Sequence, residues 1–388
     1  MTVTAPKGFR AAGVTAGIKT SGNRDVALVV NDGPSAAAAA VFTMNRCEAH
    51  PVTWSRKAVA DGSISAVLIN SGGANCFTGA FGYETVEVTA AAAAAKLGIA
   101  DTDVLVCSTG LIGAGDQTFR DGVLKGIDLA YDALGTDTES GEQAADAIRT
   151  TDSVIKVGVR EGTGGYTIGA MAKGAGMLAP GLATMLVVIT TDADLESAAL
   201  DAALREATRV SFDRVDSDGA MSTNDTVALL ASGASGITPD TAEFTELLRG
   251  LCNDLAKQLQ QDAEGASHDI TITTMGAASE TDAVNVSRAV SRSNLFKAAI
   301  FGNDPNWGRV LAAIGTTDAE FVPEQIDVSM NGAMVCKAGT PYVPVDQVDL
   351  TPRETTVLIN LHAGDAEATI LTNDLTHDYV HENSAYSS

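Results

Sequence analysis

The chain alternates between short apolar runs and longer stretches whose apolar residues recur at helical spacing. Short runs rich in valine, isoleucine and leucine predict buried β-strands. Such runs cover residues 26–30, 66–69, 104–107, 185–189, 226–230, 270–273 and 356–360. Because predicted strands and helices are mixed from one end of the chain to the other, the pattern predicts an α/β fold.

Four stretches have the pattern of helices: residues 83–97, 194–210, 241–264 and 287–300. The first carries Lys96 near its end and is followed by Gly98, a combination typical of a helix C-terminus. No linker rich in serine and proline divides the chain, and the glycine-rich tract 161–181 is the weakest boundary in composition. We therefore expect the parts on either side of this tract to be interleaved in one fold.

The composition excludes several classes of function. The chain has 388 residues, of which 49 are acidic and 25 basic, so its formal net charge is −24. This acidic excess opposes binding to nucleic acids and to anionic membranes, both of which require a basic surface. No apolar run approaches the length of a membrane span, and the N-terminus lacks the pattern of a signal peptide. We therefore expect a cytoplasmic protein.

Cysteine and histidine give no sign of a metal site. The five cysteines are scattered and show no CxxC spacing, and the five histidines include no HExxH motif. We expect neither a disulfide framework nor bound zinc.

The most informative stretch is 173–190. Lys173 precedes a loop with four glycines or prolines between residues 174 and 181, and Thr184 stands where this loop passes into the predicted strand. If the chain were cut before Thr184, that residue would carry a free α-amine beside its hydroxyl. The amine could then act as the base that activates the hydroxyl as a nucleophile. An ordinary loop before a buried strand fits the same residues, so the local pattern alone does not decide.

A second candidate lies at residues 107–113, CSTGLIG, where a predicted strand runs into a turn containing Thr109 and Gly110. The backbone amides and the threonine hydroxyl of such a turn can bind an anion, including the oxyanion of an acyl-transfer intermediate. A plain turn between a strand and a helix is the alternative.

Several blocks, taken in order, resemble the ornithine acetyltransferase family, also called glutamate N-acetyltransferases. They are STG at 108–110, TTD at 150–152, KGAG to AT between 173 and 184, and DAEGAS at 262–267. The resemblance extends from Pro6 to the last residues and so covers nearly the whole chain. It implies self-cleavage between Ala183 and Thr184 into fragments 1–183 and 184–388. It also implies a layered α/β sandwich similar to that of self-cleaving aminopeptidases, with the two fragments interleaved and two copies of each in the assembly.

The resemblance also implies roles for individual residues. Thr184 would be the nucleophile, and Thr109 and Gly110 would form the oxyanion hole. The substrate contacts implied by the family motifs are Thr150, Lys173, Thr184, Glu264, Asn383 and Ser388. In these contacts Lys173 binds the substrate carboxylate and Glu264 binds the α-ammonium of an amino-acid substrate. The C-terminal residues Asn383 and Ser388 close the site over the substrate.

The implied reaction transfers an acetyl group from N2-acetyl-L-ornithine to L-glutamate, through an acetyl-threonine intermediate, in arginine biosynthesis. Two half-reactions on one nucleophile imply ping-pong kinetics. No metal or organic cofactor is required, and whether acetyl-CoA also serves as a donor stays open. Two alternatives remain: a self-processing aminopeptidase that uses the same nucleophile, and a binding protein that stays uncut.

The chain departs from the family pattern at two places. The family usually continues from TTD with threonine and proline before a lysine, whereas residues 153–156 here are SVIK, which leaves open whether Thr150 or Thr151 contacts the substrate. His268 stands where the family often has lysine. The clusters 222–226 and 302–309 match family blocks, but clusters of Asn and Asp commonly stabilise turns. We expect them to be structural, with Asn303 and Arg309 as outer groups near the site.

Overall fold

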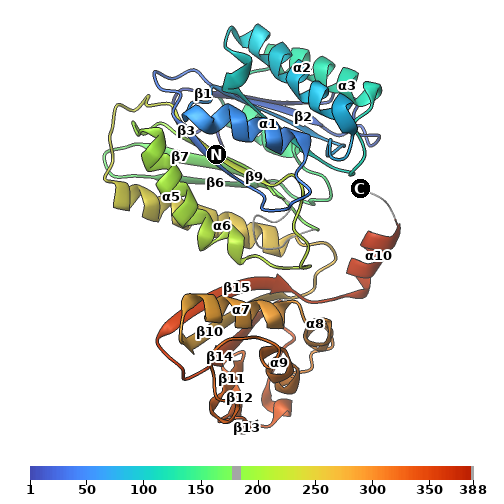
Figure 1. Cartoon of the computed structure of the whole chain (residues 1–388), viewed down its shortest axis with the longest axis vertical. Coiled ribbons are helices and arrows are strands. Elements are labelled where there is room, and N and C mark those ends of the chain that lie inside the picture. Colours follow the sequence, from blue (N-terminus) through green and yellow to red (C-terminus); the bar gives the residue numbers. More distant parts are fainter. Residues whose placement is uncertain (177–184, 386–388) are drawn as a thin grey trace.

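The computed structural model describes residues 1–176 and 185–385, which form three β-sheets flanked by helices (Figure 1). The first sheet has the order β1–β2–β4–β5, with bounds β1 Phe9–Val14, β2 Val26–Asn31, β4 Ala66–Ser71 and β5 Val104–Thr109. Strands β4 and β5 run parallel and are joined through helix α2 (Gly79–Leu97). Helix α2 and helix α3 (Gln117–Asp132) cover the outer face of this sheet.

The second sheet contains strands from both sides of the glycine-rich tract. Its order is β3–β9–β8–β7–β6, with bounds β3 Ala38–Phe42, β9 Thr226–Ala231, β8 Leu186–Thr191, β7 Thr167–Lys173 and β6 Lys156–Glu161. Helices α5 (Ser197–Arg209) and α6 (Thr241–Gln261) pack on its outer face. Strands β7 and β8 are antiparallel neighbours, and Lys173 pairs with Leu186. The parts before and after residue 184 are therefore interleaved in one sheet.

The first two sheets stack face to face, and helices α1 (His50–Ala58) and α4 (Thr138–Ala147) complete the core between them. Alternation along β8 explains how one strand serves two cores. Val187 and Ile189 face helices α5 and α6, whereas Leu186 and Val188 face the first sheet. Because side chains alternate between the two faces of a strand, a continuous apolar run is what a strand buried on both faces requires.

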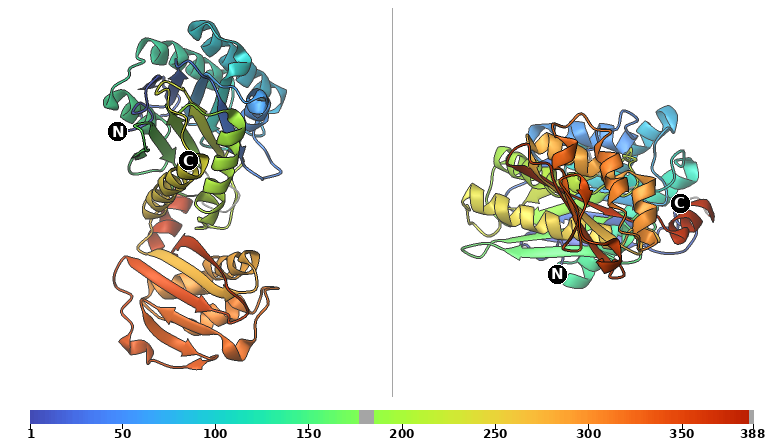
Figure 2. Two further views of the ribbon diagram at one scale, coloured as in Figure 1. Left: turned by 90° about the vertical axis from the view of Figure 1, so that its left-hand side faces the viewer. Right: turned by 90° about the horizontal axis from the view of Figure 1, so that it is seen from below.

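The third sheet belongs to a separate C-terminal unit (Figures 1 and 2). Its order is β13–β12–β11–β14–β10–β15, with bounds β10 Asp269–Ala277, β11 Asp327–Met330, β12 Ala333–Lys337, β13 Thr340–Pro341, β14 Glu354–Asn360 and β15 Ala366–Asn373. Helices α7 (Glu280–Ser291), α8 (Asn294–Phe301) and α9 (Trp307–Ile314) pack against this sheet, and all three contribute side chains to its core. The last helix, α10 (His377–Ala385), returns toward the stacked sheets.

The α/β class and all seven predicted strands are confirmed, whereas one predicted helix is wrong. Residues 287–300 belong to two helices, α7 and α8, because the hydroxyl of Ser293 accepts from the amide of Phe296 and starts a new helix. Helix α6 ends at Gln261, before Glu264. Lys173 is not a solvated loop residue, since it ends strand β7 and is buried. Within residues 1–176 and 185–385, no helix is both long enough and apolar enough to cross a bilayer.

Candidate active site

A cavity of about 280 Å³ lies where strands β5 and β7 end and strands β8 and β9 begin. It brings together most of the residues that the sequence singles out: Thr109, Gly110, Thr150, Lys173, Glu264 and Asn383. These residues come from segments far apart in the chain, so their convergence is a product of the fold. Ala183, Thr184 and Ser388 lie outside the described residues.

Lys173 lies at the centre of this group and is only 2 % exposed. Its ammonium group donates to the hydroxyl of Thr150 at 2.7 Å and to the hydroxyl of Thr109 at 3.3 Å. Burial lowers the pKa of Lys173, and the nearby carboxylate of Asp152 opposes that shift. A buried cation that lines a cavity and is held by hydroxyl groups is well suited to bind a carboxylate.

Asp152 supplies the negative charge behind the site. Its carboxylate accepts from the ammonium of Lys156 at 2.7 Å and from the amide of Gly174 at 2.6 Å, and it lies 3.9 Å from the ammonium of Lys173. Burial alone would raise the pKa of Asp152, but the charges of Lys173 and Lys156 and these hydrogen bonds lower it to about 2. Asp152 also accepts from the amide of Thr150 at 3.0 Å, so it fixes the backbone on both sides of the cavity.

The turn after β5 has the geometry of an anion site. Gly110 has φ +131°, and a Cβ atom there would lie 2.6 Å from the amide nitrogen of Gly73, so only glycine fits. The amide of Gly110 has no hydrogen-bond acceptor among the described residues. The hydroxyl of Thr109 accepts from Lys173, which leaves its own proton available to a group in the cavity. This turn can therefore offer two donors to one oxyanion.

Glu264 faces the cavity from the turn after α6. Its amide donates to the carbonyl of Ala175 at 3.2 Å, and its carboxylate accepts from the side-chain amide of Asn383 at 3.0 Å. A Cβ atom on Gly176 would come within 2.6 Å of this carboxylate, so the glycine allows the close approach. The C-terminal helix thus reaches the same cavity as Lys173 and Thr109.

Three residues of the 222–226 cluster, which the sequence suggested to be structural, line the cavity: Ser222, Thr223 and Asn224. The side-chain amide of Asn224 donates to the carbonyls of Ala74 and Ser108, at 2.7 Å and 2.9 Å, and so fixes the turn that presents Thr109. Asp225 accepts from the amide of Met185, the residue after Thr184, at 3.0 Å. Burial raises the pKa of Asp225 well above its usual range. The signals in the sequence were that this polar cluster matches a family block and that it directly precedes a buried strand.

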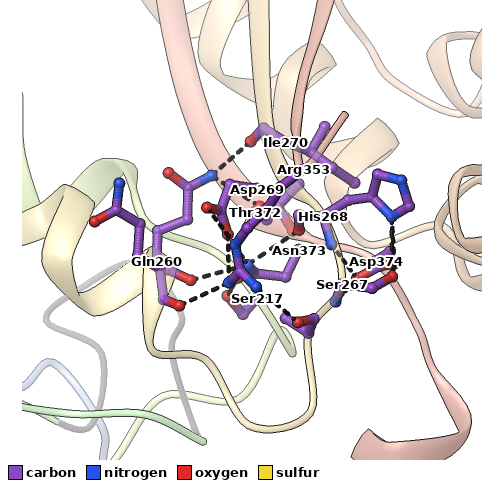
Figure 3. Close-up of polar contacts among 12 residues, drawn as sticks. Ser217, Gln260, Ser267, His268, Asp269, Ile270, Arg353, Thr372, Asn373 and Asp374 are labelled. Atoms are coloured by element: carbon purple, nitrogen blue, oxygen red, sulfur yellow. Dashed lines mark hydrogen bonds and ion pairs between the residues drawn. The ribbon is translucent and has the colours of Figure 1, made fainter. Parts of the chain in front are cut away.

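The departures from the family pattern have structural partners. Ser153 and Lys156 both bond to the carboxylate of Asp262, so the 153–156 segment is tied to the turn that carries Glu264. His268 lies 2.7 Å from the carboxylate of Asp374 and 2.9 Å from the carbonyl of Leu350, the first of which is drawn in Figure 3. Both ring nitrogens therefore face oxygen atoms, and the ring is tied to two segments that are distant in sequence.

Asn303 and Arg309, expected as outer groups, are not among the described residues that line the cavity. Arg309 instead donates to the carbonyl of Leu295. Among the described residues, no group of three His, Cys, Asp or Glu side chains is arranged to hold a metal ion.

Comparison with known proteins shows the family of this chain. The model of the ArgJ family matches residues 10–388. The chain belongs to the ArgJ family. It is 58 % identical to the arginine biosynthesis bifunctional protein ArgJ of Thermobifida fusca and 58 % identical to the protein of that name from Streptomyces coelicolor, over 100 % of each chain in both comparisons. A solved structure of ornithine acetyltransferase from Mycobacterium tuberculosis, in complex with ornithine, is 45 % identical, with a TM-score of 0.45, over 48 % of this chain and 96 % of the other.

Proposed function

We propose that this ArgJ-family protein transfers an acetyl group from N2-acetyl-L-ornithine to L-glutamate through an acetyl ester on Thr184. The observation that carries the proposal is the convergence of Thr109, Gly110, Lys173 and Glu264 on one cavity beside the start of β8. A cation, an anion and two oxyanion donors are the groups that an N-acetylated amino acid would need.

The first half-reaction forms the acetyl-enzyme. The hydroxyl oxygen of Thr184 attacks the acetyl carbonyl, and its proton passes to the free α-amine of the same residue. Thr109 and Gly110 donate to the oxygen that becomes negative. The carbon–nitrogen bond then breaks, and the α-amine returns the proton to the nitrogen of the departing ornithine.

The second half-reaction runs in reverse with a different amine. The unprotonated α-amine of glutamate attacks the ester carbonyl, the bond to the Thr184 oxygen breaks, and the proton lost by the glutamate nitrogen returns to that oxygen by way of the α-amine. Lys173 would hold the α-carboxylate of each substrate in turn. We also propose acetyl-CoA as a second donor, since an acyl thioester could acylate the same hydroxyl.

The mechanism requires a cut between Ala183 and Thr184, which gives fragments 1–183 and 184–388. Strands β7 and β8 would remain paired after the cut through the register of Lys173 with Leu186. We propose an assembly with two copies of each fragment in the cytoplasm, without nucleic acid or membrane as a partner and without a bound cofactor.

Mass spectrometry of the purified protein tests the proposal. The wild-type chain should appear as two fragments, and brief exposure to N2-acetylornithine should add one acetyl group to the fragment that begins with Thr184. Thr184→Ala should give one intact, inactive chain. An intact wild-type chain with full transferase activity would refute the mechanism, and release of free acetate in place of transfer would favour the aminopeptidase alternative.

A further inference from the structure

One buried lysine near the active site has no ion-pair partner within residues 1–176 and 185–385. Lys297, on helix α8, is 7 % exposed, and its ammonium group donates to the backbone carbonyl of Ser217. Among the described residues, no carboxylate lies within 4.0 Å of this group. Lys156, in contrast, is fully buried and bonds to two carboxylates. A buried ammonium group has three protons to donate, and an unpaired buried charge is costly unless a ligand compensates it.

Lys297 lines a second cavity, of about 80 Å³, that adjoins the active site. The two cavities share Gly176 and Glu264 in their linings. A ligand bound to Lys173 in the first cavity can therefore extend past Glu264 toward Lys297. The smaller cavity has room for the end of a side chain and not for a whole amino acid.

The acidic residues around Lys297 differ in the number of hydrogen bonds and ion pairs that they make with other residues. Asp374 accepts from His268 and from Ser267, contacts that are drawn in Figure 3. Asp216 is paired with Arg292 at 2.8 Å.

Asp218 lines the same cavity, and its carboxylate accepts a hydrogen bond from the amide of Ala220 at 3.0 Å. Desolvation of its carboxylate raises the pKa of Asp218 to about 6, although the residue as a whole is exposed. Burial also lowers the pKa of Lys297, and Asp218 opposes that shift most strongly among the nearby charges. Lys297 and Asp218 are thus the charged groups of this cavity that are least committed to other partners.

The proposed reaction demands a second cation. Ornithine ends in an ammonium group and glutamate ends in a carboxylate, yet both must place their α-amino nitrogen at the same acetyl group. Glu264 suits the ammonium of ornithine and would repel the side-chain carboxylate of glutamate. Lys173 is already needed for the α-carboxylate.

We infer that Lys297 binds the side-chain carboxylate of glutamate and so makes the second half-reaction specific for that acceptor. The inference rests on the proposed function. It assigns the two ends of one extended site to substrates of opposite charge, with Glu264 for ornithine and Lys297 for glutamate. No other part of the reaction depends on Lys297.

The test compares glutamate with its neutral isostere glutamine as acetyl acceptors. Lys297→Met keeps the length of the side chain and removes its charge. We expect the KM for glutamate to rise about 10- to 100-fold, as for loss of a charged hydrogen bond, and the preference for glutamate over glutamine to disappear. Formation of the acetyl-enzyme from N2-acetylornithine should change much less. Lys257→Met, which removes an exposed charge from helix α6, is the matched control.

A second variant covers the case in which Lys297→Met fails to fold. Asp218→Asn removes the anion that competes with the substrate carboxylate, so the KM for glutamate should fall a few-fold while that for glutamine stays constant. An unchanged glutamate-to-glutamine preference in either folded variant, or equal losses in both half-reactions, would overturn the inference. Calorimetric binding of glutamate and glutamine gives a readout that needs no chemistry. One result would refute the proposed function and retain the subsite. In that case the wild-type protein would form no acetyl-enzyme, and the Lys297→Met variant would lose the selective binding of glutamate that the wild type shows.

Discussion

The ammonium group of Lys173 lies 3.3 Å from the hydroxyl oxygen of Thr109. This contact joins the proposed carboxylate site to the proposed oxyanion site, because Lys173 occupies a lone pair of the hydroxyl and leaves its proton to point elsewhere. The two residues come from the ends of β5 and β7, in different sheets. The stacking of those sheets therefore sets the distance between the substrate carboxylate and the carbonyl that reacts.

Thr109→Ala should slow formation of the acetyl-enzyme about 10²- to 10³-fold, the usual effect of losing one oxyanion donor. Self-cleavage should slow as well, because attack on the Ala183 carbonyl also forms an oxyanion. Rapid-quench mass spectrometry measures both rates. Thr273→Ala, the same change in the C-terminal sheet, serves as the control. Unchanged rates in a folded Thr109→Ala variant would make this threonine structural.

Substitutions of Lys173 and Glu264 should affect the KM of different substrates, because each residue is proposed to bind a different substrate group. Lys173→Ala should raise the KM of substrates with an α-carboxylate. Glu264→Ala should raise the KM of substrates with an amino group. Both variants should therefore show a raised KM for N2-acetylornithine. A simple acetyl ester that lacks both groups provides the comparison. If each variant loses as much activity on the simple ester as on N2-acetylornithine, the two residues support the fold and not recognition.

Asp152 should contribute to stability in a defined pH window. Its pKa is about 2 in the folded chain and 3.8 in the reference state, so the contribution is complete above pH 4 and is lost as the pH falls toward 2. The destabilisation caused by Asp152→Asn should shrink by about 1 kcal/mol between pH 5 and pH 3. Urea unfolding in the uncleaved Thr184→Ala background measures it. A difference that stays constant across this range would mean that the carboxylate is not held by the two lysines.

Strand positions could be predicted from the sequence because a strand buried on both faces must be apolar throughout, as in β8. The break between α7 and α8 was missed because the apolar spacing continues across it, while one hydroxyl, that of Ser293, ends the hydrogen-bond ladder and starts another. The local spacing of apolar residues predicts which residues are buried better than it predicts where one helix ends and the next begins.

The residues of the candidate site could be predicted where a motif resembles that of a known family, and Thr109, Lys173 and Glu264, for example, do line one cavity. Asn224 and Asp225 were assigned to a structural turn because their partners, Ser108 and Met185, are distant in sequence. No local pattern predicts these contacts. Lys297 gave no signal at all, since a lysine in a predicted helix is normally solvated. Its significance comes from burial without a carboxylate partner among the described residues, which depends on tertiary packing.

The C-terminal helix gives the last prediction. Asn383 is exposed, yet its side chain donates to Glu264, and the hydroxyl of Thr376 at the base of the helix donates to the carbonyl of Gly265 at 2.6 Å. Removal of residues 383–388 leaves this base intact, so the shortened chain should still cut itself and assemble. It should lose most acetyl transfer to glutamate, and hydrolysis of the acetyl-enzyme should gain, because the cavity is left open to water.

Acetate release and acetylglutamate formation, measured from one acetyl-enzyme preparation, give the ratio of hydrolysis to transfer. Asn383→Ala in the full-length chain is the matched variant, since it removes only the contact with Glu264. A smaller shift in the same direction would show that the contact contributes to closure. If the shortened chain transfers acetyl groups as well as the full-length chain does, residues 383–388 have no part in binding the substrate or excluding water.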